Sequence, residues 1–528
     1  MVEASTPPGT GRKNSHNRQG MAREAGNDVR VFAKGGAVQM VGLAMQRVLQ
    51  FLFGAIAVRI LGTAGYGVYR QVAQVLNIGA TLGLGGFHVA VVRFIARARS
   101  TGDHAGVRGA ARTAMVGTGV LSFLIAAIIV LGADPIARAF VPDAQQRTQF
   151  AALFRLGAIY VPLFAAMRVL QGCTQAYKTM VPSVVIGNIV QPGVRFVAGA
   201  TVLVAGLEVT GAIWTLWLSM GVAALVGAWM YLRILEPEER VATGHLNFGE
   251  MLKFSFPQGL SQLLSIQSSG MGIIFLGILS TNRQVGLFAV ALALQAPGQV
   301  VHAAVQNIWA PLVADLYERG EIDRLRSLFQ TITRWVATCS LPIFGILMVE
   351  PDLFVRLFGG ADAADAAIVA AVVAAGNVFF TGTGPTGYAI AMIGRPFVNL
   401  MNSVTAVALY IGLGLILVPA YDALGMAIVY AVVNALLNIA RAFECQVLAG
   451  IQPFGRTFYK PVLGTLGGAG TLLLWRLVPG QGTVVELAGV ALAAAVAILV
   501  LWALGMDPEE RYVWDLIRGK LLRGRGGR

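Results

Sequence analysis

Three arginines stand inside stretches of sequence that are otherwise apolar. Arg47 and Arg195 lie deep in residues 32–58 and 181–205, and Arg155 lies nearer the end of its stretch. A charge near the middle of a bilayer costs about 2.5–3.5 kcal/mol on insertion scales, so such residues often mark a functional site. A guanidinium binds phosphate oxygens through two parallel hydrogen bonds. We therefore expect these arginines to bind an anionic ligand in a cavity; the alternative is that their long side chains reach the interface or pair structurally.

The acidic residues have the opposite distribution. None of the 26 lies near the centre of an apolar stretch. A transporter of cations needs a buried carboxylate to attract its cargo, whereas arginines without acids suit an anion such as a diphosphate. The pattern favours an anionic cargo.

Amide side chains recur at helical spacing in several apolar stretches. Gln295, Gln299, His302 and Gln306 follow the spacing i, i+4, i+7 and i+11, which places them on one face of a helix. Shorter stripes are Gln71, Gln74 and Asn77, then Gln258, Gln262, Ser265 and Ser269, then Asn434 and Asn438. Such stripes either line a cavity for a sugar or hold helices together at about 0.6 kcal/mol each. For His302 we favour a structural histidine over a proton relay.

Hydrophobic residues make up 56% of the 528 and charged residues only 12%. We count about fourteen apolar stretches, each near the ~20 residues that cross a bilayer as a helix. Their approximate bounds are 32–58, 67–92, 113–132, 150–171, 181–205, 211–232, 254–279, 285–313, 333–349, 366–393, 397–419, 423–447, 459–477 and 484–505. The composition predicts an all-α polytopic membrane protein with about 14 transmembrane helices.

Arginine and lysine gather in both tails and in alternate loops, among them the loops near residues 93–112 and 319–334. The positive-inside rule then places both termini in the cytoplasm. We expect the membrane to be the inner cell membrane. The formal net charge of +14 does not predict nucleic-acid binding, because the basic residues lie in short loops and tails beside lipid headgroups.

The polar first thirty residues are expected to form a flexible tail, with no cleaved signal peptide. Cys173, Cys339 and Cys445 are scattered and fit neither a disulfide framework nor a metal site. No residue pattern calls for a cofactor.

The two halves of the chain are related by an internal sequence repeat. Aligning Gly67 with Gly286 places Tyr69 opposite Phe288, each just after a short turn between predicted helices. Six helices separate the two turns, so the halves have the same orientation and are related by an axis along the membrane normal, with a site between them. We expect a cytoplasmic tail (1–31), an N-lobe (32–232), a linker (233–253), a C-lobe (254–447), two extra helices (459–505) and a basic cytoplasmic tail (506–528).

The sequence resembles the polysaccharide flippases of the multidrug/oligosaccharidyl-lipid/polysaccharide exporter superfamily. The segments that carry the resemblance are 59–69, 82–85, 92–96, 254–257, 285–288, 310–311, 315–323 and 341–342. The resemblance covers about residues 30–450. The extra helices resemble the pair found in the lipid II flippase branch.

The resemblance implies two lobes of six helices that alternate between inward-open and outward-open states. The implied cargo is a polyprenyl-diphosphate-linked oligosaccharide for cell-surface polysaccharide, with membrane lipids as surroundings and a polymerase and glycosyltransferases as further partners. Substrate-binding residues are predicted to be Arg47, Arg195, Arg155, Gln295, Gln299, His302 and Gln74.

Two other function classes remain as alternatives. The first is a cation-coupled multidrug exporter of the same superfamily, which would need a buried carboxylate that this sequence does not place near the centre of any apolar stretch. A membrane-embedded glycan polymerase or ligase lacks the large external loop that would carry catalytic groups; the longest, near 131–149, has no histidine. An ATP-driven pump is disfavoured because no phosphate-binding loop motif occurs. We expect a transporter and no enzyme activity.

Overall fold

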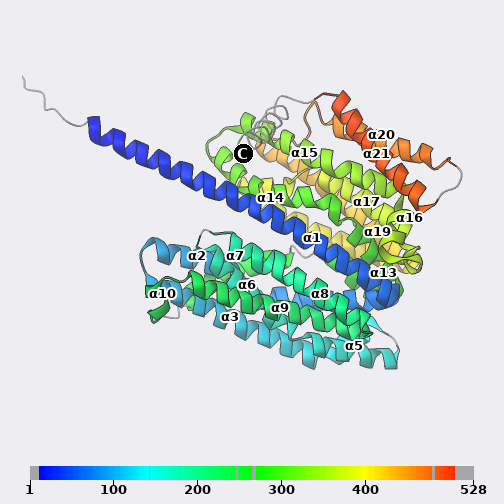
Figure 1. The fold of residues 1–528 in the computed structure, drawn as a ribbon, viewed down its shortest axis with the longest axis horizontal. Coiled ribbons are helices and arrows are strands. Elements are labelled where there is room, and N and C mark those ends of the chain that lie inside the picture. The colour runs from blue at the N-terminus through cyan, green and yellow to red at the C-terminus, as the bar shows by residue number, and fades with distance from the viewer. Residues whose placement is uncertain are drawn as a thin grey trace, which may run out of the picture.

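The computed structural model describes residues 11–141, 143–177, 179–244, 248–264, 269–478 and 482–505. Every regular element in these ranges is a helix (Figure 1). The predicted all-α class is therefore confirmed. Two lobes lie side by side, with the first part of α1 running between them.

The N-terminal lobe is formed by the elements up to α9. They are α1 (Gly11–Leu84), α2 (Phe87–Ser100), α3 (His104–Leu131), α4 (Ala133–Phe140), α5 (Ala144–Gly157), α6 (Tyr160–Gln175), α7 (Val181–Val184), a π-helical turn (Val185–Val190), α8 (Gln191–Val204) and α9 (Glu208–Ile234). The short α10 (Pro237–Val241) begins the connection to the other lobe.

The C-terminal lobe runs from α11 to α19. Its elements are α11 (Phe248–Leu264), α12 (Ser269–Leu279), α13 (Asn282–Leu294), α14 (Ala296–Glu318), α15 (Ile322–Val349), α16 (Pro351–Gly359), a 3₁₀ turn (Ala361–Ala363), α17 (Ala366–Gly382), α18 (Thr386–Met392) and α19 (Pro396–Ala449). The added pair is α20 (Tyr459–Trp475) and α21 (Thr483–Ala503). This pair packs on the outside of α15, where Ile346 contacts Leu472 and Ala493.

Nine helices in the described ranges are long and apolar enough to cross a membrane, or ten if one bent pair counts as a span. The protein is therefore a multi-pass membrane protein. Two of the nine, Val38–Ser100 and Phe397–Ala449, are far longer than one crossing needs. Each contains a non-helical residue, Gly62 (φ 68°) in α1 and Asp422 (φ 51°) in α19. The total of about fourteen crossings stays a prediction.

Some predicted helices are broken. The stretch 67–92 is interrupted at Gly85 and Gly86, which both have positive φ and separate α1 from α2. The stretch 285–313 is two helices, α13 and α14, that meet at 56°. Pro297 sits in the first turn of α14, where its missing N–H requires no helical partner. The bend thus follows from a proline that the sequence places inside an apolar run.

The lobes meet at one end of the bundle through the two repeated glycines. A Cβ on Gly67 would lie 1.8 Å from the carbonyl oxygen of Asn282, and a Cβ on Gly286 would lie 1.9 Å from that of Thr63. Thr63 and Asn282 occupy the same place in the repeat, four residues before each glycine. The contact is therefore reciprocal, as a two-fold axis between the lobes requires. We call this end of the bundle the Thr63 end.

Hydrogen bonds between the lobes support the same closure. The Asp362 carboxylate accepts the backbone N–H of Thr63 at 2.6 Å. Arg59 donates to the backbone oxygen of Leu357 at 2.6 Å. Gln71 donates to the Asn282 side chain at 2.9 Å. Backbone and side-chain contacts together close the Thr63 end.

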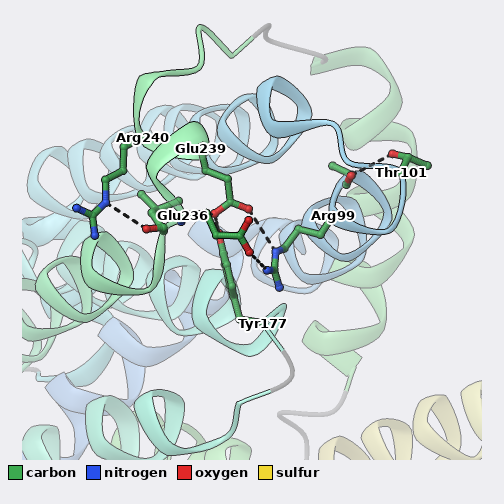
Figure 2. Close-up of polar contacts among 8 residues, drawn as sticks. Arg99, Thr101, Tyr177, Glu236, Glu239 and Arg240 are labelled. Atoms are coloured by element: carbon green, nitrogen blue, oxygen red, sulfur yellow. Dashed lines mark hydrogen bonds and ion pairs between the residues drawn. The ribbon is translucent and has the colours of Figure 1, made fainter. Parts of the chain in front are cut away.

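The opposite end, which we call the Arg99 end, carries a polar cluster inside the N-terminal lobe (Figure 2). Arg99 donates to Glu236 at 2.5 Å and to Glu239 at 3.3 Å, and the Tyr177 hydroxyl donates to Glu239 at 2.7 Å. Burial, and then the bond to Glu239, raise the pKa of Tyr177. The cluster fastens α10, and hence the start of the connection to α11, to α2 and to the end of α6.

Candidate functional site

Two cavities flank α1, one in each lobe. The C-lobe cavity has a volume of 520 Å³ and lies between α1, α13, α14, α17 and α19. The N-lobe cavity has a volume of 580 Å³ and is walled by α1, α6, the π-helical turn, α8 and α9. Gln50 and Arg70 line both. The two spaces therefore adjoin along α1.

The break at Gly62 makes α1 a wall of both cavities. Residues before it, such as Gln46, and residues after it, such as Gln74, line the same N-lobe cavity. The two parts of α1 thus lie side by side, and the change of direction falls on a residue whose φ of 68° is accessible to glycine.

Five arginines line the adjoining cavities. They are Arg47 and Arg441 in the C-lobe cavity, Arg168 and Arg195 in the N-lobe cavity, and Arg70 in both. Among the residues that the structure describes, no aspartate or glutamate lines either cavity. A concave site lined by one sign of charge concentrates ligands of the opposite sign. The geometry therefore suits an anion.

Arg47 and Arg195, the two deep arginines predicted to bind ligand, lie in different cavities. Arg195 donates to the hydroxyl of Tyr69, and its guanidinium carbon lies 5.0 Å from the centre of the Phe53 ring. Arg47 makes no hydrogen bond or ion pair with a described residue and lines the C-lobe cavity. Arg195 is therefore held in a fixed position, while Arg47 is available to a ligand.

Arg155 lies elsewhere. It forms an ion pair with Asp134 at 2.6 Å, and both side chains are about half exposed. It lines neither arginine-lined cavity. The structure thus supports the structural alternative for this residue.

The stripe on α14 does not face the cavity as a whole. Only Gln299 lines the C-lobe cavity, where it also donates to Asn377 at 2.7 Å. Gln295 lies at the bend between α13 and α14 and donates to the backbone oxygens of Ala291 and Ala370. His302 is 3% exposed and packs on Phe380 with ring centres 4.5 Å apart. For both residues these contacts support a structural role: Gln295 is bonded at the bend itself, and His302 is buried against Phe380 one turn after Gln299.

The stripe in the second part of α1 keeps two of its three predicted members, Gln74 and Asn77. Arg70, Gln74, Asn77 and Thr81 line the N-lobe cavity at i, i+4, i+7 and i+11. Gln71, which was expected in this stripe, is buried against Asn282 instead. Gln74 therefore lies where a substrate-binding residue was predicted.

In the stripe on α19, Asn434 lines the C-lobe cavity, and the side chain of Asn438 donates to the backbone oxygen of Asn434 at 2.8 Å. Gln258 lines neither arginine-lined cavity. The side chains of Gln262, Ser265 and Ser269 lie outside the described residues.

Sequence reasoning missed three cavity arginines. From the sequence, Arg70 and Arg441 are assigned to loops and Arg168 to the cytoplasmic end of a helix, so none of the three is a predicted substrate-binding residue. Each nevertheless shares helical spacing with amides that line its cavity: Arg70 with Gln74, Arg168 with Gln171 and Gln175, and Arg441 with Asn434. Extending the predicted stripes at 71–77 and 434–438 by one turn would have made Arg70 and Arg441 candidates, whereas no stripe was predicted near Arg168; the structure shows that all three line the cavities.

The C-lobe cavity also holds polar atoms that lack protein partners. Asn399 Oδ1 and Arg441 Nε are buried and make no hydrogen bond within the described residues. Both residues line the cavity. Buried polar groups are nearly always satisfied, so a polar ligand or water is expected there.

His104, Glu236 and Glu239 bring three ligand-type atoms within 4.8 Å of one another. Both glutamates already receive donors, from Arg99 and, at Glu239, from Tyr177 (Figure 2). A metal ion would stand beside the Arg99 cation. The cluster is better suited to fastening α10 than to holding a metal.

Comparison with known proteins agrees with this architecture. Over 525 residues the chain is 23% identical to Stage V sporulation protein B of Bacillus subtilis (strain 168), covering 93% of this chain and 99% of that protein. Its fold is similar to the lipid II flippase MurJ in an inward closed conformation, with TM-score 0.72, 10% identity, and 91% and 100% of the two chains covered. It is also similar to an inward-facing MATE-family multidrug resistance transporter of the MOP superfamily, with TM-score 0.68, 16% identity, and 79% and 98% covered.

The two solved structures are described as a flippase and a multidrug transporter, and their likeness to this chain shows a shared helical fold. The model of one family, described as polysaccharide biosynthesis protein, matches residues 32–317, more than half of the chain. The chain therefore belongs to the polysaccharide biosynthesis protein family.

Proposed function

We propose that this protein carries the head of a polyprenyl-diphosphate-linked oligosaccharide across the cytoplasmic membrane by alternating access. The observation that supports this most is the pair of adjoining cavities lined by five arginines and, among the described residues, no carboxylate. Family membership and the flippase relatives support the same class of cargo.

The diphosphate would lie near Arg70, the one arginine that lines both cavities. Arg47 would approach it from the first part of α1, on the other side of the Gly62 break. The two non-bridging oxygens on each phosphate share its negative charge and match the paired donors of a guanidinium. Each such charge-assisted hydrogen bond contributes about 1.5–3 kcal/mol.

The sugars would occupy the amide-rich parts of the cavities. Gln74 and Asn77 in the N-lobe cavity, and Gln299, Asn399 and Asn434 in the C-lobe cavity, offer both donors and acceptors. The unpartnered Asn399 oxygen would accept a sugar hydroxyl. The polyprenyl tail would remain in lipid beside the lobes.

In this proposal the Thr63 end faces outward and both termini face the cytoplasm. The reciprocal glycine contact and the Asp362–Thr63 hydrogen bond close that end. To release its cargo outside, the protein must break these contacts and close the Arg99 end instead. A polymerase and glycosyltransferases acting on the same lipid would be its partners.

The proposal is tested by extracting lipid-linked sugars from cells that lack the protein. Complementation would use wild type, Arg47→Ala and, as the matched control, Arg155→Ala, whose ion pair lies outside the arginine-lined cavities. We expect a polyprenyl-diphosphate oligosaccharide to accumulate with its head facing the cytoplasm. Wild type and Arg155→Ala should clear it, and Arg47→Ala should not.

If the oligosaccharide accumulates and Arg47→Ala clears it as wild type does, the anionic-site assignment is wrong. If nothing accumulates and the cells become sensitive to cationic dyes, the protein is a drug exporter. That alternative shares the fold of the MATE neighbour, but no described carboxylate in the cavities would attract a cation.

A further inference from the structure

A separate polar pocket lies at the Arg99 end of the C-terminal lobe. Its volume is 530 Å³. One wall is the beginning of α15, and the other is the segment 452–458 that joins α19 to α20. It shares no lining residue with the two arginine-lined cavities.

Two arginines give this pocket its charge. Arg334 is 7% exposed and donates to the hydroxyl of Thr457, across the pocket from α15. Arg456 is exposed and makes no ion pair or hydrogen bond with a described residue. The described lining contains no carboxylate. The pocket is therefore cationic, with one fixed and one available guanidinium.

Uncharged donors complete one wall. Ser327 and Thr331 precede Arg334 at helical spacing, so the three line one face of α15. Gln330 lies beside them. Hydroxyls, an amide and guanidinium groups in one concave space are the donors that a phosphate group needs.

The pocket lies at the depth of the lipid headgroups. The 28 residues of α15 extend about 42 Å, which exceeds the ~30 Å hydrocarbon core, and the charged residues Asp323, Arg324 and Arg326 place the excess at its first turns. Phe454 and Phe458 pack edge to face with ring centres 4.9 Å apart, and Tyr459 follows them, half exposed. Tyrosine is enriched at the membrane interface, where its amphipathic ring lies at the level of the headgroups, so Tyr459 marks that level.

An apolar surface continues from the pocket along α20. Leu463 and Leu466 are exposed on this helix, one and two turns after Tyr459. Acyl chains attached to a group in the pocket would have a surface to lie on. A soluble phosphate would make no use of it.

We propose that this pocket binds the phosphate of an anionic membrane phospholipid, held by Arg334 and Arg456. Its acyl chains lie along α20. Basic pockets between transmembrane helices at this level are suited to anionic headgroups. The bound lipid joins the connection between α19 and α20 to α15, and so stabilises the attachment of the α20–α21 pair to the C-terminal lobe.

The test is binding of short-chain lipid to the purified full-length protein in neutral detergent. The probes are dihexanoyl phosphatidylglycerol, dihexanoyl phosphatidylcholine and inorganic phosphate. We expect phosphatidylglycerol to bind more tightly than phosphatidylcholine, and inorganic phosphate not to displace it at equal concentration. Arg456→Gln should weaken phosphatidylglycerol binding about fivefold, the factor for one basic residue near an anionic surface.

Arg112→Gln is the matched control, because Arg112 is an exposed arginine near the same end of the bundle but in the other lobe. It should leave binding unchanged. Arg334→Lys, which keeps the charge but loses the planar pair of donors, should also weaken binding. Because Arg334 is buried, the exposed Arg456 keeps the test decisive if Arg334→Lys does not fold.

Equal binding by wild type and Arg456→Gln would overturn the site. An equal loss in Arg112→Gln would show general attraction to a basic surface and would overturn it as well. Displacement by inorganic phosphate would assign the pocket to a soluble phosphate and overturn the lipid proposal. None of these outcomes depends on the cargo of the arginine-lined cavities.

Discussion

Gly67→Ala should open the Thr63 end of the bundle. The added Cβ would lie 1.8 Å from the Asn282 carbonyl oxygen and 2.9 Å from the backbone nitrogen of Gly286. Carbon and oxygen atoms approach to about 3.3 Å at the closest, so the lobes would have to separate by more than 1 Å. Both neighbours are backbone atoms and cannot rotate aside.

Overpacking of this kind costs about 1–3 kcal/mol. The cost falls only on the state in which the two lobes touch at the Thr63 end. The ratio of closed to open molecules should therefore fall about 5- to 150-fold. Gly286→Ala should act in the same way, because its Cβ would lie 1.9 Å from the Thr63 carbonyl oxygen.

The assay is the distance between spin labels on the two lobes. Leu207→Cys and Tyr421→Cys are exposed sites near the Thr63 end, in a background where the three native cysteines are replaced by alanine. Gly67→Ala should increase the population at the longer distance. Gly119→Ala is the control, since it makes the same change inside a helix where a Cβ meets nothing within 4 Å.

The reasoning is refuted if Gly67→Ala leaves the distance distribution of the parent unchanged. It is also refuted if Gly119→Ala shifts the distribution as much, because the effect would then come from helix propensity rather than from contact between the lobes.

Three further predictions concern single residues. The backbone N–H of Thr63 lowers the pKa of Asp362, so this contact should persist above the lowered value and be lost only as the pH falls through it. The same spin labels should therefore show no opening between pH 8 and pH 5; opening at pH 5 would contradict the assignment. Tyr177→Phe removes a hydrogen bond to a buried carboxylate and should destabilise the N-terminal lobe by about 1.5–3 kcal/mol, seen as a lower midpoint of thermal unfolding. Arg70→Gln should reduce clearance of the lipid-linked sugar about 10- to 100-fold, with Arg155→Gln unaffected, and equal activities would exclude Arg70 from the site.

The positions of several apolar helices could be predicted closely from the sequence, although other predicted helices are broken. A bilayer accepts backbone only when its polar groups are bonded internally, so long apolar runs must form helices. The predicted bounds 211–232 and 484–505, for example, lie within a few residues of α9 and α21. The sequence predicted a loop between 32–58 and 67–92 and another between 397–419 and 423–447. In the structure a single non-helical residue, Gly62 or Asp422, turns the chain at each of these places, so no loop is needed.

From the sequence, the charge of the ligand could be predicted, but not the full set of residues that line the candidate site. An anionic cargo followed from arginines without acids, and this pattern reappears in the cavities. Which side chains face the cavities was harder, because one residue along a helix is a rotation of about 100°. Gln71 and Arg70 are neighbours in sequence, yet one bonds Asn282 in the contact between the lobes and the other lines both cavities.

The sequence by itself determined the membrane setting, the helical class, the repeat and the sign of the charge that the interior presents. These properties depend on the composition and spacing of residues within each segment, and not on how distant segments pack against one another. Only the tertiary structure decided that Gly67 and Gly286 are contact points between the lobes, that Arg155 is paired at the surface, and that Arg168 and Arg441 line cavities. These depend on how far each helix is rotated and bent against its neighbours, which packing between distant segments sets.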